Sequence, residues 1–153
     1  MPELPEVEIV RKSLNKNISG KIISEVKVKN RNLRIKIPKN FEKILKKKQI
    51  KKIGRFSKYI IFFFTDKSYC IFHLGMSGTI HLLKKCAENK FTNTSFYHSP
   101  HLPKKHNHLE INFNNQKLIY NDPRRFGYIL FFNSKKELLK KFENFGPEPF
   151  SKK

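Results

Sequence analysis

The first residues of the chain carry a candidate nucleophile. Removal of Met1 would expose the secondary amine of Pro2, next to the carboxyl group of Glu3. A terminal amine has a pKa near about 7.7–8.0, against about 10.4 for lysine, so part of it is unprotonated at neutral pH. When such an amine attacks the aldehyde-level carbon of a sugar, the resulting iminium draws electrons and favours elimination. Glu3 could supply a general acid to the same sugar.

A purely structural interpretation of the same start stays open. Proline is common in the first turn of a helix, where its missing N–H costs nothing. Acidic residues are favourable near the positive end of a helix, and Glu3, Glu6 and Glu8 follow Pro2 closely. Both interpretations predict a helix at the N-terminus, and only one of them predicts chemistry.

A helix would hold the N-terminus in place. Apolar residues at helical spacing predict it from Pro5 to Ile18, with Gly20 as its stop. Its inward face is expected to consist of Val7, Val10, Leu14 and Ile18. One buried face would fix the position of Pro2 at the start of the helix.

After this helix, polar and apolar residues alternate in short runs, which predicts strands. The apolar run Tyr59–Phe64 is too short to span a membrane and predicts a buried strand. Residues 84–106 have little periodicity and are expected to form a long loop, a kind of segment that is often functional. Strands are expected at residues 22–28, 31–37, 50–56, 59–64, 69–74, 79–83, 108–113, 117–120 and 128–132.

Two more helices complete the expected elements. Residues 38–47 predict a short helix with Phe41, Ile44 and Leu45 inward, and residues 134–145 predict a capped helix that ends at Gly146. The fold class is therefore α+β, an antiparallel two-layer β-sandwich of about eight strands flanked by an N-terminal and a C-terminal helix. One domain is expected over residues 1–145, and residues 146–153 are expected to begin a linker.

The charge of the chain indicates a polyanionic partner. Its 153 residues include 33 Lys and Arg against 12 Asp and Glu, a net charge of +21. Because the basic residues are interleaved with predicted strands, nucleic acid is the favoured partner, although AT-rich coding could also enrich lysine. No apolar run approaches a membrane span and no signal-peptide pattern is present. Cys70 and Cys86 are too few and wrongly spaced for a zinc site and indicate free thiols in a reducing compartment.

Six short stretches occur in order along the chain: Pro2–Glu8, Gly54–Tyr59, His73–Gly78, Lys105–His108, Asp122–Gly127 and Gly146–Pro149. Together they resemble the N-terminal domain of bacterial formamidopyrimidine-DNA glycosylases. The resemblance covers essentially the whole chain. The related endonuclease VIII group is the closest competitor, but its start has Gly where this chain has Leu4 and Pro5.

The resemblance implies a catalytic role for the N-terminal residues. Pro2 would attack C1′ of the damaged nucleotide and form a Schiff base, and Glu3 would protonate the deoxyribose ring oxygen. Lys58 would assist the elimination, although a lysine at a strand edge is also an ordinary surface cation. Glu6 would support the active site by orienting the helix start.

The resemblance also implies DNA contacts. An enzyme that acts on a base in duplex DNA must extrude that base, and apolar wedges with an arginine offset the lost stacking. Ordinary burial stays open as the alternative for His73, and core packing for Met76 and Phe126. The residues expected to bind DNA are His73, Met76, His106, Arg124, Arg125 and Phe126.

What the resemblance implies for the whole protein is base excision repair. The expected activity removes 8-oxoguanine and formamidopyrimidines from double-stranded DNA and nicks the abasic site by β/δ-elimination, in a monomer of the bacterial cytoplasm. Members of the family continue into a helix-two-turn-helix module and a four-cysteine zinc finger, whereas this chain ends at Lys153. No cofactor is expected in this chain, and the structural zinc of the family is expected only in that missing part.

Three functions stay open from the sequence. The first is the catalytic domain of a glycosylase with lyase activity, with an endonuclease VIII-like preference for oxidised pyrimidines as its variant. The second is a DNA-binding remnant without turnover. The third is an enzyme that uses Pro2 as a general base, as tautomerases do, which the charge and the Arg124 and Phe126 stretch disfavour.

Overall fold

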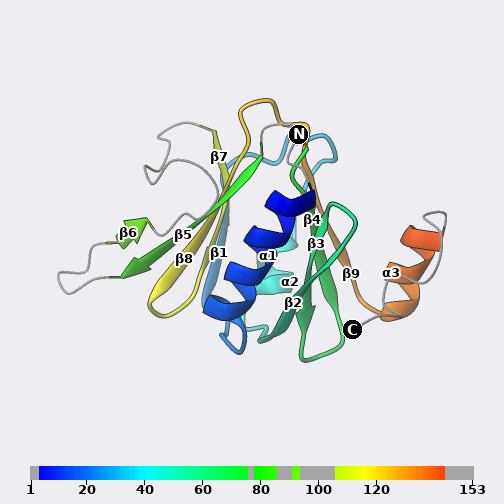
Figure 1. Cartoon of the computed structure of the whole chain (residues 1–153), viewed down its shortest axis with the longest axis horizontal. Coiled ribbons are helices and arrows are strands. Elements are labelled where there is room, and N and C mark those ends of the chain that lie inside the picture. Colours follow the sequence, from blue (N-terminus) through cyan, green and yellow to red (C-terminus); the bar gives the residue numbers. More distant parts are fainter. Residues whose placement is uncertain (1–3, 76–77, 86–90, 94–105, 144–153) are drawn as a thin grey trace.

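Two antiparallel sheets form the body of the protein (Figure 1). The computed structural model describes residues 4–75, 78–85, 91–93 and 106–143. One sheet has the strand order β1-β7-β8-β5-β6 and the other the order β2-β3-β4-β9. The strands are β1 Glu25–Val28, β2 Ile50–Phe56, β3 Tyr59–Phe64, β4 Tyr69–His73, β5 Thr79–Lys85, β6 Phe91–Asn93, β7 Asn107–Asn112, β8 Gln116–Asn121 and β9 Tyr128–Phe132.

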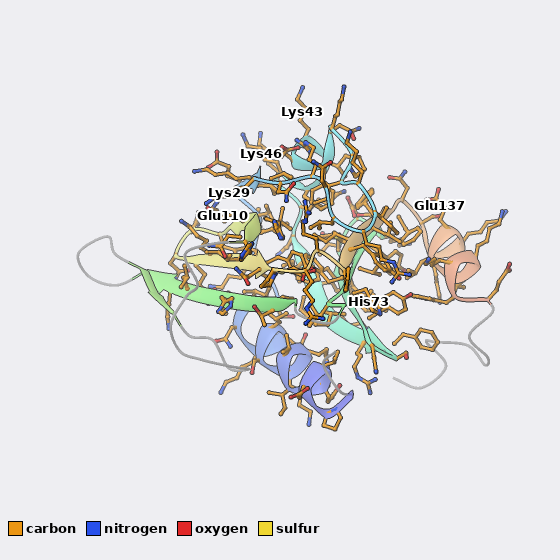
Figure 2. All side chains as sticks on the ribbon, turned by 90° about the horizontal axis from the view of Figure 1, so that it is seen from above. Lys29, Lys43, Lys46, His73, Glu110 and Glu137 are labelled. Atoms are coloured by element: carbon orange, nitrogen blue, oxygen red, sulfur yellow. The ribbon has the colours of Figure 1, made fainter. Side chains whose placement is uncertain are left out.

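Helices close the two open sides of this sandwich. Helix α1, Leu4–Ile18, and helix α2, Phe41–Leu45, lie on opposite sides of the sheets when the molecule is seen from above, where Lys43 marks α2 (Figure 2). The expected inward face of α1 is buried in the main core, to which both sheets contribute. Burial of that face confirms the amphipathic helix that its periodicity predicts. The inward residues of α1 are Val7, Val10, Leu14 and Ile18.

Strand β3 is buried on both faces, which explains its unbroken apolar run. Side chains such as Ile60 and Phe62 enter the main core, whereas Ile61 enters a second cluster with Leu138 and Phe142. The last two belong to helix α3, Lys135–Phe142, which packs on the outer face of the four-stranded sheet. A strand covered on both faces has no polar positions to alternate with.

Helix α3 begins at the expected cap. The hydroxyl of Ser134 accepts a hydrogen bond from the backbone N–H of Glu137, at 3.3 Å. The carboxylate of Glu137 accepts in turn from the backbone N–H of Asn133, at 3.1 Å. The first bond satisfies an N–H group that the first turn of a helix leaves without a helical partner, and the second ties the residue before the cap to the same turn. The expected stop at Gly146 and the expected linker, residues 146–153, lie outside the described residues.

Residues 31–37 do not form the expected strand. The backbone N–H groups of Leu33 and Ile37 both donate to the carbonyl of Arg31, at 3.0 Å each, so this segment turns on itself. The Arg31 side chain holds the turn by donating to the carbonyl of Pro38 at 2.7 Å and by pairing with Glu42. Leu33 and Ile37 are buried, so the alternation that predicted a strand reflects a turn anchored at two apolar points.

Other boundaries also differ from the expectation. Strand β1 begins at Glu25 instead of residue 22, and Ile22 makes only an isolated bridge with Gln49. Helix α2 stops at Leu45, because Lys47 adopts a positive φ of 73° that a helix cannot continue through. Strand β6 lies within residues 84–106, which were expected to be loop throughout, and it brings the described strands to nine.

Candidate functional site

The N-terminal residues with candidate chemistry, Pro2 and Glu3, lie outside the described residues, which begin at Leu4. The helix that follows them is described, with Glu6 half-buried in its first turn. Two residues later Glu8 pairs with Arg11 and Arg55. The hydrogen bond from Arg11, followed by that from Arg55, lowers the pKa of Glu8 to about 2, although burial opposes the shift.

Arg55 connects this helix to the turn that carries Lys58. Its Nε donates to Glu8 at 2.8 Å, and its Nη1 donates to the carbonyl of Ser57, also at 2.8 Å. Ser57 and Lys58 form the tight connection between β2 and β3, where Phe56 pairs with Tyr59 and Ser57 has a positive φ of 53°. A single guanidinium therefore sets the position of the Lys58 turn relative to the N-terminal helix.

His73 lies at the end of β4 between two tyrosines. Its ring centre is 5.1 Å from that of Tyr59 and 5.1 Å from that of Tyr128. The backbone N–H of Gly75 donates to His73 Nδ1 at 3.1 Å, so the neutral ring carries its proton on Nε2. Burial lowers the pKa of His73, and the positive charges of Arg34 and Lys58 lower it further. His73 is thus suited to act as a neutral N–H donor.

Cations gather around this aromatic group. Arg34 lies over the ring of Tyr128 with its Cζ 5.7 Å from the ring centre, and Lys141 Nζ is 5.8 Å from the same centre. Such contacts hold flexible cationic side chains against a rigid surface. With Lys58, these groups make the neighbourhood of His73 electropositive, which suits a phosphate.

The segment Asp122–Gly127 presents three of the expected DNA-binding residues on one turn. Arg124, Arg125 and Phe126 are all exposed, and Phe126 keeps 47% of its surface accessible. An exposed phenylalanine is not a core residue, so the core-packing alternative for Phe126 is wrong. Its exposed ring remains available for stacking.

His106 and Gly75 adjoin this turn. The carbonyl of His106 accepts from the backbone N–H of Asp122 at 3.0 Å. Met76 lies outside the described residues, but Gly75 before it has a positive φ of 63°, and a Cβ there would come within 2.7 Å of the Phe126 carbonyl carbon. Gly75 therefore packs directly on the backbone of the Phe126 turn.

Sequence reasoning missed several residues of this site. Tyr59 and Tyr128 were given no role in a site, although Tyr59 is the last residue of one stretch that carries the family resemblance and Tyr128 directly follows another. Arg34 was hidden in a segment expected to be a strand, and Arg55 was not distinguished from other basic residues. Lys141 had no sequence signal, because only the packing of α3 brings it to Tyr128.

Comparison with known proteins decides the family. The family profile "Formamidopyrimidine-DNA glycosylase N-terminal domain" matches residues 1–129. The chain belongs to this family. A formamidopyrimidine-DNA glycosylase of Legionella pneumophila strain Philadelphia 1 is 35% identical over 99% of this chain and 50% of its own length. The corresponding Wolbachia pipientis protein from Culex pipiens is 41% identical over 99% of this chain and 51% of its own length.

Solved structures of the family agree with the fold. The Lactococcus lactis FPG in complex with DNA containing Fapy-dG matches with a TM-score of 0.75 and 32% identity, over 92% of this chain and 48% of that one. The complex of the same enzyme with DNA containing an abasic site gives a TM-score of 0.75 at 32% identity, over 92% and 47%. The formamidopyrimidine-DNA glycosylase fold of this chain thus spans about half the length of the relatives that it matches.

The residues present do not fit the structural zinc of the formamidopyrimidine-DNA glycosylase family. The chain has two cysteines, and Cys86 lies outside the described residues. Cys70 is fully buried, and burial raises the pKa of its thiol, which disfavours the thiolate that zinc requires. In the described ranges no three His, Cys, Asp or Glu side chains come together as metal ligands would. No chemical step of this chain is therefore assigned to zinc.

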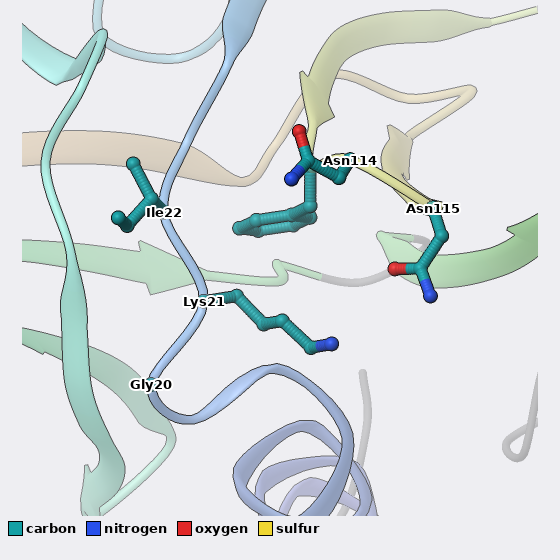
Figure 3. A pocket seen from close by; sticks show the side chains of 6 residues that line it. Gly20, Lys21, Ile22, Asn114 and Asn115 are labelled. Carbon is teal, nitrogen blue, oxygen red and sulfur yellow. The ribbon is translucent and has the colours of Figure 1, made fainter.

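One pocket lies apart from the site. It has a volume of about 400 Å³ and opens beyond the C-terminal end of α1 (Figure 3). The pocket is lined by Gly20, Lys21, Ile22, Phe113, Asn114 and Asn115.

None of the helices in the described part of the chain has the length and apolar character needed to cross a membrane.

Proposed function

We propose that this protein acts in base excision repair as a DNA glycosylase with AP lyase activity on oxidised purines. The observation that carries the proposal is the packing of the Gly75 turn against the turn of the exposed Phe126, beside the cations around His73. The proposed partner is double-stranded damaged DNA, bound by a monomer in the bacterial cytoplasm. Residues 1–145 are proposed as the catalytic domain and residues 146–153 as the start of a linker.

The proposed chemistry begins at Pro2. Its nitrogen lone pair forms a bond to C1′ while the bond from C1′ to the damaged base breaks, and the base leaves with that electron pair and takes up a proton. Glu3 gives a proton to the ring oxygen, so the sugar ring opens and an iminium forms. The proline nitrogen gives up its one N–H proton when it bonds to C1′, so the iminium has no N–H left to lose and its positive charge persists. Loss of a C2′ proton then expels the 3′ phosphate, and a second elimination expels the 5′ phosphate.

Lys58 and its neighbours support this step. The lysine lies on the turn that Arg55 ties to Glu8 of helix α1. We assign Lys58 to charge stabilisation during elimination and Glu6 to the support of the helix start. His73, through its Nε2–H, and Arg34 would bind the phosphates beside the lesion.

The Phe126 turn would replace the extruded base. Removal of a base from the stack leaves a hole that apolar side chains fill and a partner base that an arginine hydrogen-bonds. We assign the filling to Phe126 and Met76, and the contact with the partner base to Arg124. Arg125 and His106, which lie on and beside this turn, would contact the DNA backbone.

Borohydride trapping tests the proposal. The protein with Met1 removed should form a covalent adduct with abasic DNA under borohydride, and Pro2→Gly and a form that retains Met1 should not. An equal adduct from the form that retains Met1 would show that Pro2 is not the nucleophile. Binding without any adduct would identify a DNA-binding remnant.

A second assay tests the substrate class. Duplexes that contain 8-oxoguanine or an oxidised pyrimidine are compared at one salt concentration, because phosphate contacts make affinity depend on salt. Release of the purine lesion is the expected result. Preferential release of the pyrimidine would instead support endonuclease VIII-like specificity.

A further inference from the structure

Asp122 is a buried carboxylate with hydrogen-bond donors on both oxygens. None of its surface is accessible, at 0% exposure. Its Oδ2 accepts from the hydroxyl of Tyr120 at 2.7 Å and from the backbone N–H of Gly127 at 2.8 Å. Its Oδ1 accepts from the backbone N–H of Arg125 at 3.1 Å. Burial of a charged group at this depth is tolerated because such donors replace the lost water.

The backbone of Asp122 is held as firmly as its side chain. Its N–H donates to the carbonyl of His106 at 3.0 Å, and its own carbonyl lies 2.7 Å from His108 Nε2. The segment then turns sharply, because Arg125 adopts a left-handed φ of 57°. A non-glycine residue in this region needs support from its surroundings, and here the Asp122 carboxylate holds its N–H group.

The Asp122 turn is interlocked with the turn that follows His73. A Cβ at Gly127 would come within 2.0 Å of the Tyr120 hydroxyl and within 2.5 Å of the His73 carbonyl oxygen. A Cβ at Gly75 would come within 2.5 Å of the Gly127 nitrogen. Only glycine fits at either position, so the Asp122 turn and the backbone at His73 and Gly75 are in direct contact.

We propose that Asp122 is a positioning residue that holds the Phe126 turn and the His73 turn in one arrangement ready for the DNA duplex. The proposal rests on the proposed function, because it explains how Phe126 can enter a duplex without first being ordered. Asp122 is buried and acts through the groups that it holds. An exposed phenylalanine on a preorganised turn loses less conformational freedom on binding than one on a free loop.

The variant Asp122→Asn tests this role with little change in volume. The amide keeps one acceptor and places an NH₂ group against an N–H donor. Trapping on an abasic duplex should fall about tenfold, the equivalent of one lost charge-assisted hydrogen bond. Trapping on a single-stranded abasic oligonucleotide should fall much less, because no duplex hole is filled there and only the phosphate contact beside His73 is disturbed. Equal loss on both substrates, or no loss on either, would overturn the proposal.

A matched control and a double variant sharpen the result. Asp66→Asn makes the same change in another turn carboxylate, which accepts from the Ser68 N–H at 3.0 Å, and should leave the ratio between the two substrates unchanged. If Asp122 acts through Phe126, then Asp122→Asn should add little to the duplex defect of Phe126→Ala. Fully additive effects would contradict the assignment.

Two measurements cover other outcomes. If Asp122→Asn fails to fold, Tyr120→Phe removes one donor and keeps the buried ring, and it should lower duplex trapping in the same selective way. Amide hydrogen exchange at Gly127 and Arg125 should be slow in the unaltered protein and faster in the variants, independent of any activity. Absence of trapping by the unaltered protein would reject the proposed function, whereas unchanged exchange in the variants would reject the role of Asp122.

Discussion

His73 and Tyr128 stack face to face, with ring centres 5.1 Å apart and ring planes 3° from parallel. They are direct cross-strand partners in the pairing of β4 with β9. Tyr128 also shares a hydrogen bond of 2.7 Å with the hydroxyl of Tyr59 on β3. Three strands thus fix the plane of the His73 ring, and the bond from Gly75 fixes its tautomer.

This environment predicts how stability depends on pH. Burial, with the nearby Arg34 and Lys58, lowers the pKa of His73 in the folded protein. The unfolded chain then binds the proton more readily, so the stability contributed by neutral His73 is complete above about pH 6.5 and is lost as the pH falls through the lowered pKa. As the pH falls from 8 to 5, the free energy of unfolding measured with urea should decrease more steeply for the unaltered protein than for His73→Gln. Parallel curves would contradict this.

Because Arg55 links Glu8 to the Lys58 turn, we expect a substitution at Arg55 to lower activity more than it lowers stability. Arg55→Lys keeps the charge but cannot donate in a fork to both Glu8 and Ser57. The free energy of unfolding should change by less than about 1 kcal/mol, because the pair is partly exposed. The rate of trapping should fall roughly tenfold, since a small displacement of the Lys58 turn misplaces a reacting group. Arg11→Lys alters the other partner of Glu8 and should leave the rate unchanged.

Glu3 should matter for excision more than for abasic sites. Excision of a base needs an acid at the sugar ring oxygen, whereas a ready-made abasic site already offers an aldehyde to Pro2. Glu3→Gln should therefore slow base release from a lesion duplex far more than trapping on abasic DNA. Gel assays on both substrates measure the two rates. If both rates slowed equally, Glu3 would act on the Pro2 amine and not on the sugar ring oxygen.

The exposed turn residues should affect recognition only. Phe126→Ala and Arg124→Ala should each weaken binding to a lesion duplex by about 1–3 kcal/mol, the scale of a lost stack or base contact. Trapping on a single-stranded abasic oligonucleotide should be nearly unchanged. The two substrates are compared for each variant at one salt concentration. If Phe126→Ala reduced both equally, the turn would serve the fold and not the duplex.

Local patterns in the sequence determined the helices and strands that can be predicted from neighbouring residues alone. Helix α1 follows from apolar residues spaced at each turn, and helix α3 begins at Ser134 because its hydroxyl caps the Glu137 N–H. The β3 strand follows from its apolar run, and the hairpin of β7 and β8 from the strands on either side of a short turn. Each of these signals is contained within a few neighbouring residues.

Residues 31–37 show where a local pattern fails. Their alternation suits a strand, but a strand needs an edge to pair with, and the backbone of Arg31 bonds to Leu33 and Ile37 instead. The same turn brings the Arg34 N–H to the Gly127 carbonyl at 3.3 Å and its side chain over Tyr128. Which segment lies beside another was decided by tertiary packing.

The sequence determined the residue types of the site, including the family stretches with Lys58, His73 and Phe126. Only the tertiary structure decided that Asp122 is buried at 0% exposure between Tyr120 and Gly127, and that Gly75 fits against the Phe126 turn. The physical reason is that these contacts depend on strand register and on the close approach of two backbones. Neither leaves a periodic signal in the segments that take part.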